Sequence, residues 1–530
     1  MSNIGFDFGT TNSIISYHDS ESGTLRCFRR TANDTDYIPT VISYIQRRDN
    51  LSVQIGKAAK MRGDGNPNTY GRFKLRLGTR FDAPLPGKEK TAHEVARDFI
   101  SKLLQDFRDS GRTIERLVMT IPEAWYREQS NYTTRENIRT ILTDIGLGRE
   151  QFSFQSEPVA AAAYFCWQWE KTQNAPFLGK LLVIDYGGGT LDVTLCEVSE
   201  SGRKIRTIDN YGSGSEDNGV ESGHAGSAFL ARVITNVCKQ YGYELNDTDF
   251  ALACTELEDY LINEKELVDR EMGDYIIDPE SADLDELEPL FSLTRMDDCE
   301  VNCSHLYRAF QEINATVLKD ALNQISGVNE FDLQNTKIVF VGGFSNLFCV
   351  ESQVRLHFHS NPAANDPRFP RTLSDENKAL AIAKGAALIA DNKVFIDLVF
   401  PYEVGIIVGH AAPDHPEVFV DDYVPLIAKN DKIADYTEAK FLGSVINIFA
   451  GQNLFIRMYR KIAGETQVFH LSNRDDLWRI FPDSDHATIH IGISVDQDMI
   501  PTLYTKDENG NIRTASLNRI LERLNMQIES

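Results

Sequence analysis

The sequence lacks the features that direct a chain to or through a membrane. No Lys or Arg precedes Arg26, so the charged start of a signal peptide is missing. The longest apolar stretches, residues 158–169 and 380–390, are shorter than the roughly 18 uninterrupted residues that a membrane span needs. We therefore expect a cytoplasmic protein without a membrane partner.

Basic residues and cysteines are also scarce. The chain carries 54 Lys and Arg against 78 Asp and Glu, a net charge of -24, so its field repels phosphate backbones and argues against a nucleic-acid partner. Its 8 cysteines are scattered over 530 residues, which without an export signal indicates reduced thiols rather than a disulfide framework. Because domains typically hold roughly 100–200 residues, we expect several folded units.

Two segments share one pattern, which is the most informative feature of the sequence. Residues 4–13 (IGFDFGTTNS) and 182–192 (LVIDYGGGTLD) each read as an apolar strand ending in Asp, then a turn of small residues, then a second strand. The two aspartates, Asp7 and Asp185, lie 178 residues apart. An internal duplication of this kind predicts two similar lobes that face each other, with the turns meeting between them.

The remaining chain divides into an α/β part and a β-rich part. Strand and helix patterns alternate up to a small-residue helix at 379–390, and a third glycine-rich turn follows the strand pattern of residues 338–345 (IVFVGGFS). From residue 394 onward, short β-branched and aromatic runs are separated by Pro, Gly, Asp and Asn. We expect a separate, mostly β domain there, with a helical tail starting at Ala515.

An aspartate at the end of a strand, next to backbone amides that glycine exposes, suits a site for phosphate and metal. Turn amides and Thr hydroxyls bind phosphate oxygens, while Asp holds hydrated Mg²⁺. A single glycine-rich turn would be weak support, since such turns are common for steric reasons. Two matching Asp-containing turns and a third Gly-Gly turn predict a nucleotide triphosphate clasped between two hairpins. Neither a Walker lysine motif nor a Rossmann fingerprint is present as a competing site.

The two hairpins and the third turn resemble the phosphate-1, phosphate-2 and adenosine motifs of the superfamily of actin, sugar kinases and heat-shock chaperones. Finer matches resemble the seventy-kilodalton heat-shock chaperones (DnaK-type) in particular: YIPTVISY at 37–44, IGKAAK at 55–60, NTYGRFK at 68–74 and SEPVAAAA at 156–163. The resemblance covers residues 3 to 390 and continues more loosely through PYEVGI at 401–406 and VPLI at 424–427.

The resemblance implies a two-lobed α/β actin-like ATPase with duplicated, ribonuclease H-like lobes. It is followed by a smaller, mostly β sandwich domain and a short C-terminal helix. The implied boundaries are a nucleotide-binding domain at 1–390, a linker at 391–398, a peptide-binding-like β-sandwich at 399–513 and a truncated helical lid at 514–530. Since the family's lid is much longer, we expect weak peptide affinity with fast exchange.

The resemblance also implies roles for individual residues. Lys74 would orient the attacking water, Thr190 would bond the γ-phosphate or that water, and Asp192 would support the nucleophile and a monovalent cation such as K⁺. Asp7, Asp185 and Glu157 would be ligands of Mg²⁺ and its waters. The residues that would surround the phosphates and the nucleoside of ATP or ADP are Gly9, Thr10, Thr11, Asn12, Gly187, Gly188, Gly189, Gly226, Gly342, Gly343 and Ser345.

The implied function is an ATP-dependent chaperone that couples its nucleotide state to the binding of exposed apolar peptide segments of client proteins. J-domain co-chaperones and nucleotide exchange factors are the implied partners. One departure favours an alternative: Asn346 stands where the family usually has an adenine-stacking Arg. The alternatives are a dedicated co-chaperone or regulatory ATPase for one partner, or a metabolite kinase of the same superfamily. A kinase and an actin-like filament subunit would both lack the β-rich segment.

Overall fold

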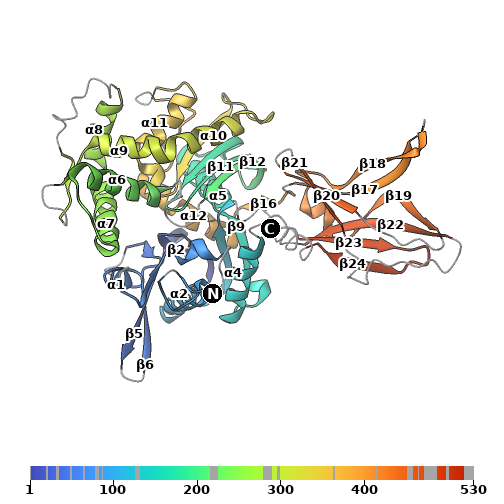
Figure 1. The fold of residues 1–530 in the computed structure, drawn as a ribbon, viewed down its shortest axis with the longest axis horizontal. Coiled ribbons are helices and arrows are strands. Elements are labelled where there is room, and N and C mark those ends of the chain that lie inside the picture. The colour runs from blue at the N-terminus through green and yellow to red at the C-terminus, as the bar shows by residue number, and fades with distance from the viewer. Residues whose placement is uncertain are drawn as a thin grey trace. The chain divides into compact units, whose positions relative to one another are not determined.

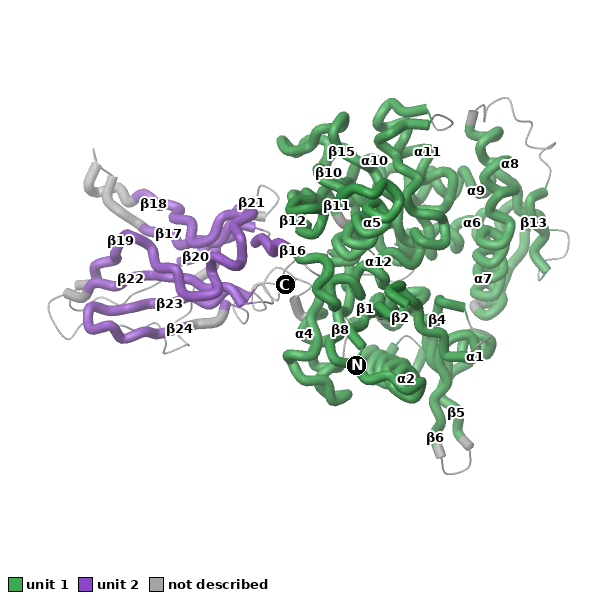
Figure 2. The backbone as a smooth tube through the Cα atoms, turned by 180° about the vertical axis from the view of Figure 1, so that it is seen from behind, with its two compact units in different colours: residues 1–396 green, residues 397–530 purple. Residues whose placement is uncertain are grey.

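The structure is a computed structural model that falls into two compact units, residues 1–396 and 397–530 (Figure 2). It describes residues 2–19, 22–31, 35–47, 50–63, 66–77, 83–85, 87–123, 125, 132–214, 225–277, 289–294, 299–361, 365–400, 402–412, 415–449, 457–462, 465–470, 486–496 and 500–517. Among these residues, no helix combines the length and the apolar character that crossing a membrane requires.

The first sheet of unit 1 is built around the first hairpin. Its strand order is β3-β2-β1-β8-β9, and β4 pairs with β2. Strand β1 runs antiparallel to β2 and parallel to β8, which runs parallel to β9. Apolar residues of β1 pack with the buried faces of helices α2 and α4 in one core. The elements are β1 (Ser2–Phe8), β2 (Asn12–Asp19), β3 (Thr24–Cys27), β4 (Ile38–Pro39), β8 (Ile114–Ile121), β9 (Phe152–Ser156), α2 (Ala92–Asp109) and α4 (Tyr132–Asp144).

The second sheet repeats this arrangement around the second hairpin. Its order is β15-β10-β11-β12-β16; β10 and β11 are antiparallel, and β10 and β15 are parallel. Helix α12 contacts both sheets, with Leu380 and Ala383 against Ile14 of β2 and other residues in one core with α5, β10 and β11 (Figure 1). The elements are β10 (Gly179–Tyr186), β11 (Thr190–Ser199), β12 (Lys204–Gly214), β15 (Thr336–Val341), β16 (Phe395–Asp397), α5 (Glu157–Gln173) and α12 (Asp375–Ala390).

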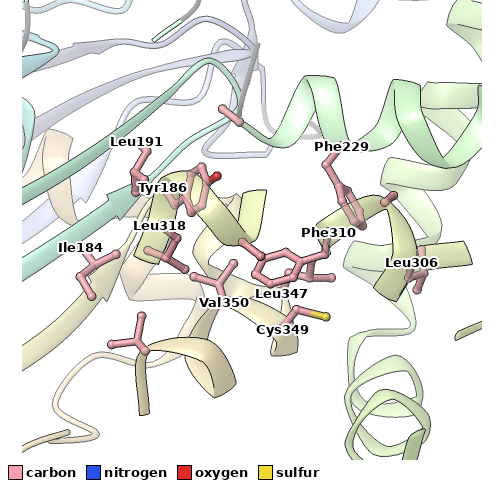
Figure 3. Close-up of a cluster of buried hydrophobic side chains, with 14 of the residues drawn as sticks. Ile184, Tyr186, Leu191, Phe229, Leu306, Phe310, Leu318, Leu347, Cys349 and Val350 are labelled. Atoms are coloured by element: carbon pink, nitrogen blue, oxygen red, sulfur yellow. The ribbon is translucent and has the colours of Figure 1, made fainter. Parts of the chain in front are cut away.

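A mainly helical region packs against the second sheet. The side chains of Tyr186, Phe229 and Phe310 lie in its core (Figure 3). One continuous helical stretch of this region consists of α9, a π-helical segment at Gln311–Ala315 and α10. The elements are α6 (Gly226–Tyr241), α7 (Asp247–Asn263), α8 (Lys265–Ile277), β13 (Phe291–Ser292), β14 (Glu300–Val301), α9 (Cys303–Phe310), α10 (Thr316–Ser326), η5 (Phe344–Asn346) and α11 (Phe348–His357).

A small three-stranded sheet, of order β6-β5-β7, carries the short helix that holds Lys74. Its strands are β5 (Val41–Arg47), β6 (Asn50–Ile55) and β7 (Thr69–Gly71). The short helices nearby are α1 (Lys57–Lys60) and η1 (Phe73–Arg76), and η2 (Arg149–Gln151) precedes β9. Phe73 of η1 is fully buried in the core of the first sheet, which anchors the helix there.

Unit 2 contains two four-stranded antiparallel sheets, of order β18-β17-β20-β21 and β19-β22-β23-β24. In β22, Ile489, Ile491 and Ile493 are buried, and so are Gly492 and Ser494, so this strand is covered on both faces over residues 491–495. The elements are β17 (Glu403–Ala412), β18 (His415–Ile427), η6 (Ile433–Tyr436), β19 (Lys440–Phe449), β20 (Arg457–Ile462), β21 (Glu465–His470), β22 (His486–Val495), β23 (Pro501–Lys506) and β24 (Ile512–Ser516).

Two expectations near the domain ends change. The helical tail was expected from residue 514 or 515, but residues 514–516 belong to β24, which pairs with β23. The expected helix at 518–530 lies outside the described residues. Within the expected linker, β16 is the edge strand of the second sheet, and the Phe395 amide donates a hydrogen bond to the Arg203 carbonyl oxygen (2.7 Å).

Candidate functional site

Three parallel strands of the first sheet end at one edge and bring acidic residues together. Asp7 of β1 lies opposite Thr120 of β8, and Ile121 of β8 lies opposite Ser156 of β9, the residue before Glu157. The Thr120 hydroxyl donates a hydrogen bond to Asp7 Oδ1 (3.3 Å). Since the carboxyl ends of parallel strands are where open α/β sheets bind ligands, this edge is a candidate site.

The second sheet places a matching pair of carboxylates at its own strand ends. Asp185 of β10 lies directly opposite Asp192 of β11, and both are buried. On its other side, Asp185 lies opposite Val341, the last residue of β15. Gly342 follows with a φ of +82°, and a Cβ atom there would come within 2.5 Å of Asp185 Oδ1. Only glycine therefore lets the third turn pass so close to this carboxylate.

Lys74 is the one cation that the structure shows paired with these buried carboxylates. Its Nζ lies 3.0 Å from Glu157 Oε1, and the two side chains are only 3% and 8% exposed. The same Nζ lies 5.7 Å from the ring centre of Phe8 and 5.2 Å from that of Trp125. Because water hardly reaches the pair and aromatic rings lie beside Lys74, the attraction between the two charges is screened less than in a pair on the surface.

Burial, followed by repulsion from neighbouring carboxylates, raises the pKa values of Asp7, Asp185 and Asp192. Burial, followed by the charge of Glu157, raises the pKa of Asp7 to about 7. Burial and then the charges of Glu157, Asp192 and Asp7 raise the pKa of Asp185 well above its ordinary value. The pKa of Asp192 is raised in the same way, first by burial and then by Glu157 and Glu123. If all these carboxyl groups were ionised, their negative charge would exceed what Lys74 alone can balance.

The turns of the two hairpins touch. A Cβ atom at Gly188 would come within 2.5 Å of Thr11 Oγ1, and one at Gly189 would come within 2.7 Å of Thr10 Oγ1. The absence of side chains at these glycines therefore lets the two Thr hydroxyls approach the backbone of the second turn. This arrangement agrees with the expectation that the two turns meet.

The second turn also holds the start of helix α6. The amides of Gly226 and Ser227 donate hydrogen bonds to the carbonyl oxygens of Gly187 (3.1 Å) and Gly188 (2.9 Å). Gly226 lies against the ring of Phe344, which also contacts Tyr186 and Phe229 at centroid distances of 4.9 and 5.1 Å.

Ser345, Gly343 and Asn12, which were expected to contact the nucleotide, differ in their surroundings. The Ser345 hydroxyl donates to the Gly342 carbonyl oxygen (2.8 Å), whereas Gly343 faces open space. Asn12 lies in β2 opposite Pro39, with its carbonyl oxygen beside Gly9. The hydrogen bond from Ser345 therefore stabilises the third turn, and the space next to Gly343 is open.

Two residues of the site were missed from the sequence. Glu123 and Trp125 follow β8 and Pro122 and are 1% and 7% exposed. The available signal was a carboxylate two residues after the end of a strand pattern, near the edge where Asp7 ends its own strand. This signal is weak, because the sequence around Pro122 contains neither glycine nor a matching hairpin.

The carboxylates fit a divalent cation that keeps water and phosphate oxygens among its ligands. Asp185 Oδ2 is buried without a hydrogen-bond partner, so an oxygen suited to a hard cation is available. Within the described ranges, no three acidic, His or Cys side chains are close enough to enclose a metal ion. Mg²⁺ typically uses one or two carboxylates plus substrate phosphates, which matches this partial set.

The raised pKa of Asp7 predicts a pH dependence of stability for the protein without nucleotide and metal. Unfolded Asp ionises near 3.8, whereas folded Asp7 holds its proton up to about pH 7. The folded state therefore binds more protons in this window, and stability falls as pH rises from about 4 to 7. We expect the thermal midpoint in EDTA to be lower at pH 8 than at pH 5.5.

An Asp7→Asn variant tests the assignment of this pH dependence to Asp7. It should show a flatter profile, because the titrating group is gone, whereas the exposed Asp109→Asn should keep the slope of the parent. A parent protein whose stability rises with pH across this range would contradict the prediction.

Comparison with known proteins gives one family. The family model described as "Hsp70 protein" matches residues 83–394. Among similar curated proteins is the chaperone protein DnaK of Mycoplasmopsis agalactiae, which is 24% identical over 516 residues, 96% of this chain and 77% of the relative. The chaperone protein DnaK of Metamycoplasma hominis is 24% identical over 518 residues, 96% of this chain and 78% of the relative.

Proposed function

Because the chain belongs to the Hsp70 protein family, whose members are ATPases, we propose that it is an ATP-dependent chaperone. The observation that carries this proposal is the buried Lys74–Glu157 pair, set among Asp7, Asp185 and Asp192 beside two touching turns. This arrangement supports ATP hydrolysis, and the coverage of 96% of the chain by DnaK relatives supports chaperone action. The predicted family is confirmed.

Positioning and charge stabilisation are the main contributions of a protein to phosphoryl transfer. We assign Lys74 to orient the attacking water, with Glu157 holding its ammonium group in place. Thr190 would bond the γ-phosphate or that water, and Asp192 would support the nucleophile together with a monovalent cation such as K⁺. Gly9, Thr10, Thr11 and Asn12 would contact the phosphates from one hairpin, and Gly187, Gly188 and Gly189 from the other.

Asp7, Asp185 and Glu157 would hold Mg²⁺ and its waters, and the ion would neutralise charge on the phosphate oxygens. The raised pKa values support this assignment, because a bound cation would relieve the repulsion among these carboxylates. Gly226, Gly342, Gly343 and Ser345 would line the nucleoside side. Asn346 cannot stack on a base as Arg does, so base affinity would depend more on the surrounding backbone.

The domain assignment remains our proposal: two lobes in residues 1–390, a linker at 391–398 and a β-sandwich at 399–513 that binds apolar peptide segments of clients. The two four-stranded sheets of unit 2 support the sandwich. Strand β16 supports a coupling role for the linker, because it extends the sheet that carries Asp185 and Asp192. J-domain co-chaperones and exchange factors are the partners that the family implies.

The rate at which a fluorescent apolar peptide dissociates tests the coupling. We expect release to be at least about fivefold faster in ATP with Mg²⁺ and K⁺ than in ADP, the lower end of typical coupling between sites. Omitting Mg²⁺ or K⁺ in turn separates the roles of the two cations. As a control, Phe395→Pro removes the amide that donates to Arg203, so this variant should hydrolyse ATP without accelerating peptide release.

Two outcomes would replace the proposal. If ATP is hydrolysed but no peptide binds in either state, a dedicated ATPase for one partner is the better description. If a small-molecule acceptor becomes phosphorylated instead, the protein is a metabolite kinase.

A further inference from the structure

Glu123 is almost completely buried in the site, but the proposed function assigns it no part in binding or hydrolysis. It follows β8 and Pro122 and is 1% exposed. Its Oε2 accepts a hydrogen bond from the Ser156 hydroxyl, which lies at the end of the neighbouring strand β9. Burying a carboxylate is costly unless it is paired, so this contact is part of what allows Glu123 to lie there.

Ser156 occupies the position at which helix α5 begins. It is the N-cap residue of α5, and Glu157 is the first helical residue. A serine at this position usually accepts a hydrogen bond from a backbone amide of the first turn. Here its side chain makes no capping bond, and its hydroxyl donates to Glu123 instead. The start of α5 is thus connected to the segment that follows β8 and Pro122.

Trp125, two residues after Glu123, contacts Lys74, the other member of the ion pair. The Trp125 ring centre lies 5.2 Å from Lys74 Nζ, and Lys74 pairs with Glu157 at 3.0 Å. Trp125 therefore contacts Lys74 directly, and Glu123 reaches Glu157 through its neighbour Ser156.

We propose that Glu123 is a positioning residue of the ATPase site: by holding the Ser156 hydroxyl, it fixes the first turn of α5 and so keeps Glu157 aligned with Lys74. The inference rests on the proposed ATPase function. A small displacement of a group that orients a reactant lowers turnover more than substrate binding. The predicted effect is therefore on kcat rather than on KM.

The experiment compares Glu123→Ala, Ser156→Ala and the double variant by steady-state ATP hydrolysis. We expect each single variant to lower kcat about tenfold, or ~1.4 kcal/mol, with KM changed less than twofold. The double variant should be no slower than either single one, because both remove the same contact. Glu123→Gln should recover most of the rate, since its amide oxygen still accepts from Ser156. Ser153→Ala, on the same strand and half-buried, is the matched control for loss of a hydroxyl.

A second measurement, of protein stability, tests the contact between Glu123 and Ser156 without ATP hydrolysis. The loss of stability caused by Lys74→Gln should be smaller in the Glu123→Ala background than in the parent, because Glu157 is then already poorly aligned. If the parent hydrolyses no ATP, the proposed function fails, and this stability comparison still decides the role of Glu123.

Four results would overturn the positioning role. Additive rate losses in the double variant would show that Glu123 and Ser156 act separately. A Glu123→Gln variant as slow as Glu123→Ala would show that the charge matters rather than the hydrogen bond. Unchanged kcat in both single variants, or an undiminished Lys74→Gln effect in the Glu123→Ala background, would show that the contact does not align the pair. If Glu123→Ala does not fold, Ser156→Ala removes the same hydrogen bond by changing the donor instead of the acceptor.

Discussion

Replacing Lys74 with alanine is expected to slow ATP hydrolysis by at least about a hundredfold, the usual effect of removing one preorganised group that stabilises developing charge. Lys74 is the cation that the structure pairs with Glu157, at 3.0 Å, beside Asp7 and Asp185. ATP should still bind, because the glycine turns that would contact the phosphates are unchanged. Single-turnover hydrolysis and nucleotide binding, measured on the same preparation, separate the two effects.

Stability gives a second readout for Lys74. Removing one partner of a buried ion pair leaves the other charge uncompensated, which typically costs about 3–5 kcal/mol. Lys74→Ala without nucleotide should therefore melt at a lower temperature than the parent, and Mg²⁺ with ADP should restore part of the difference. The exposed Lys57→Ala is the matched control. Hydrolysis within threefold of the parent rate in Lys74→Ala would remove Lys74 from the catalytic group.

Gly342→Ala is expected to cause a large loss of stability, although it adds only one carbon atom. Gly342 has a φ of +82°, and a Cβ atom there would lie 2.5 Å from Asp185 Oδ1 and 2.7 Å from the Tyr186 carbonyl oxygen. Backbone strain and overpacking together should cost about 2–5 kcal/mol. Because backbone atoms of β10 cannot yield as a flexible side chain can, Asp185 would be displaced. Chemical denaturation of the protein without nucleotide measures the cost.

The neighbouring glycine is the control for Gly342. Gly343 has nothing within 4 Å of an added Cβ, so Gly343→Ala should change the stability of the nucleotide-free protein by much less. Nucleotide affinity in Gly342→Ala should fall at least about tenfold, because moving Asp185 removes a proposed Mg²⁺ ligand. Equal stability of the two variants would show that the third turn does not depend on the close approach to Asp185.

Local patterns were sufficient for the hairpins and for the small-residue helix expected at 379–390, which is α12. Apolar strands ending at Asp7 and Asp185, each followed by a small-residue turn, predicted β1–β2 and β10–β11, because both strand and turn signals lie within about ten consecutive residues. Element ends were less accurate, as the tail shows. Residues 514–516 continue a ladder with β23, and such pairing depends on a partner strand rather than on local helix-forming pattern.

The sequence by itself determined the family, the duplicated Asp-containing turns and the separation of an α/β part from a β-rich part. Each of these can be recognised from short contiguous stretches of sequence. Only the tertiary structure decided that Lys74 pairs with Glu157, 83 residues away, and that Glu123 holds Ser156, 33 residues away. It also decided how far the pKa of Asp7 rises, because burial and the approach of other charges depend on how the strand ends are packed together.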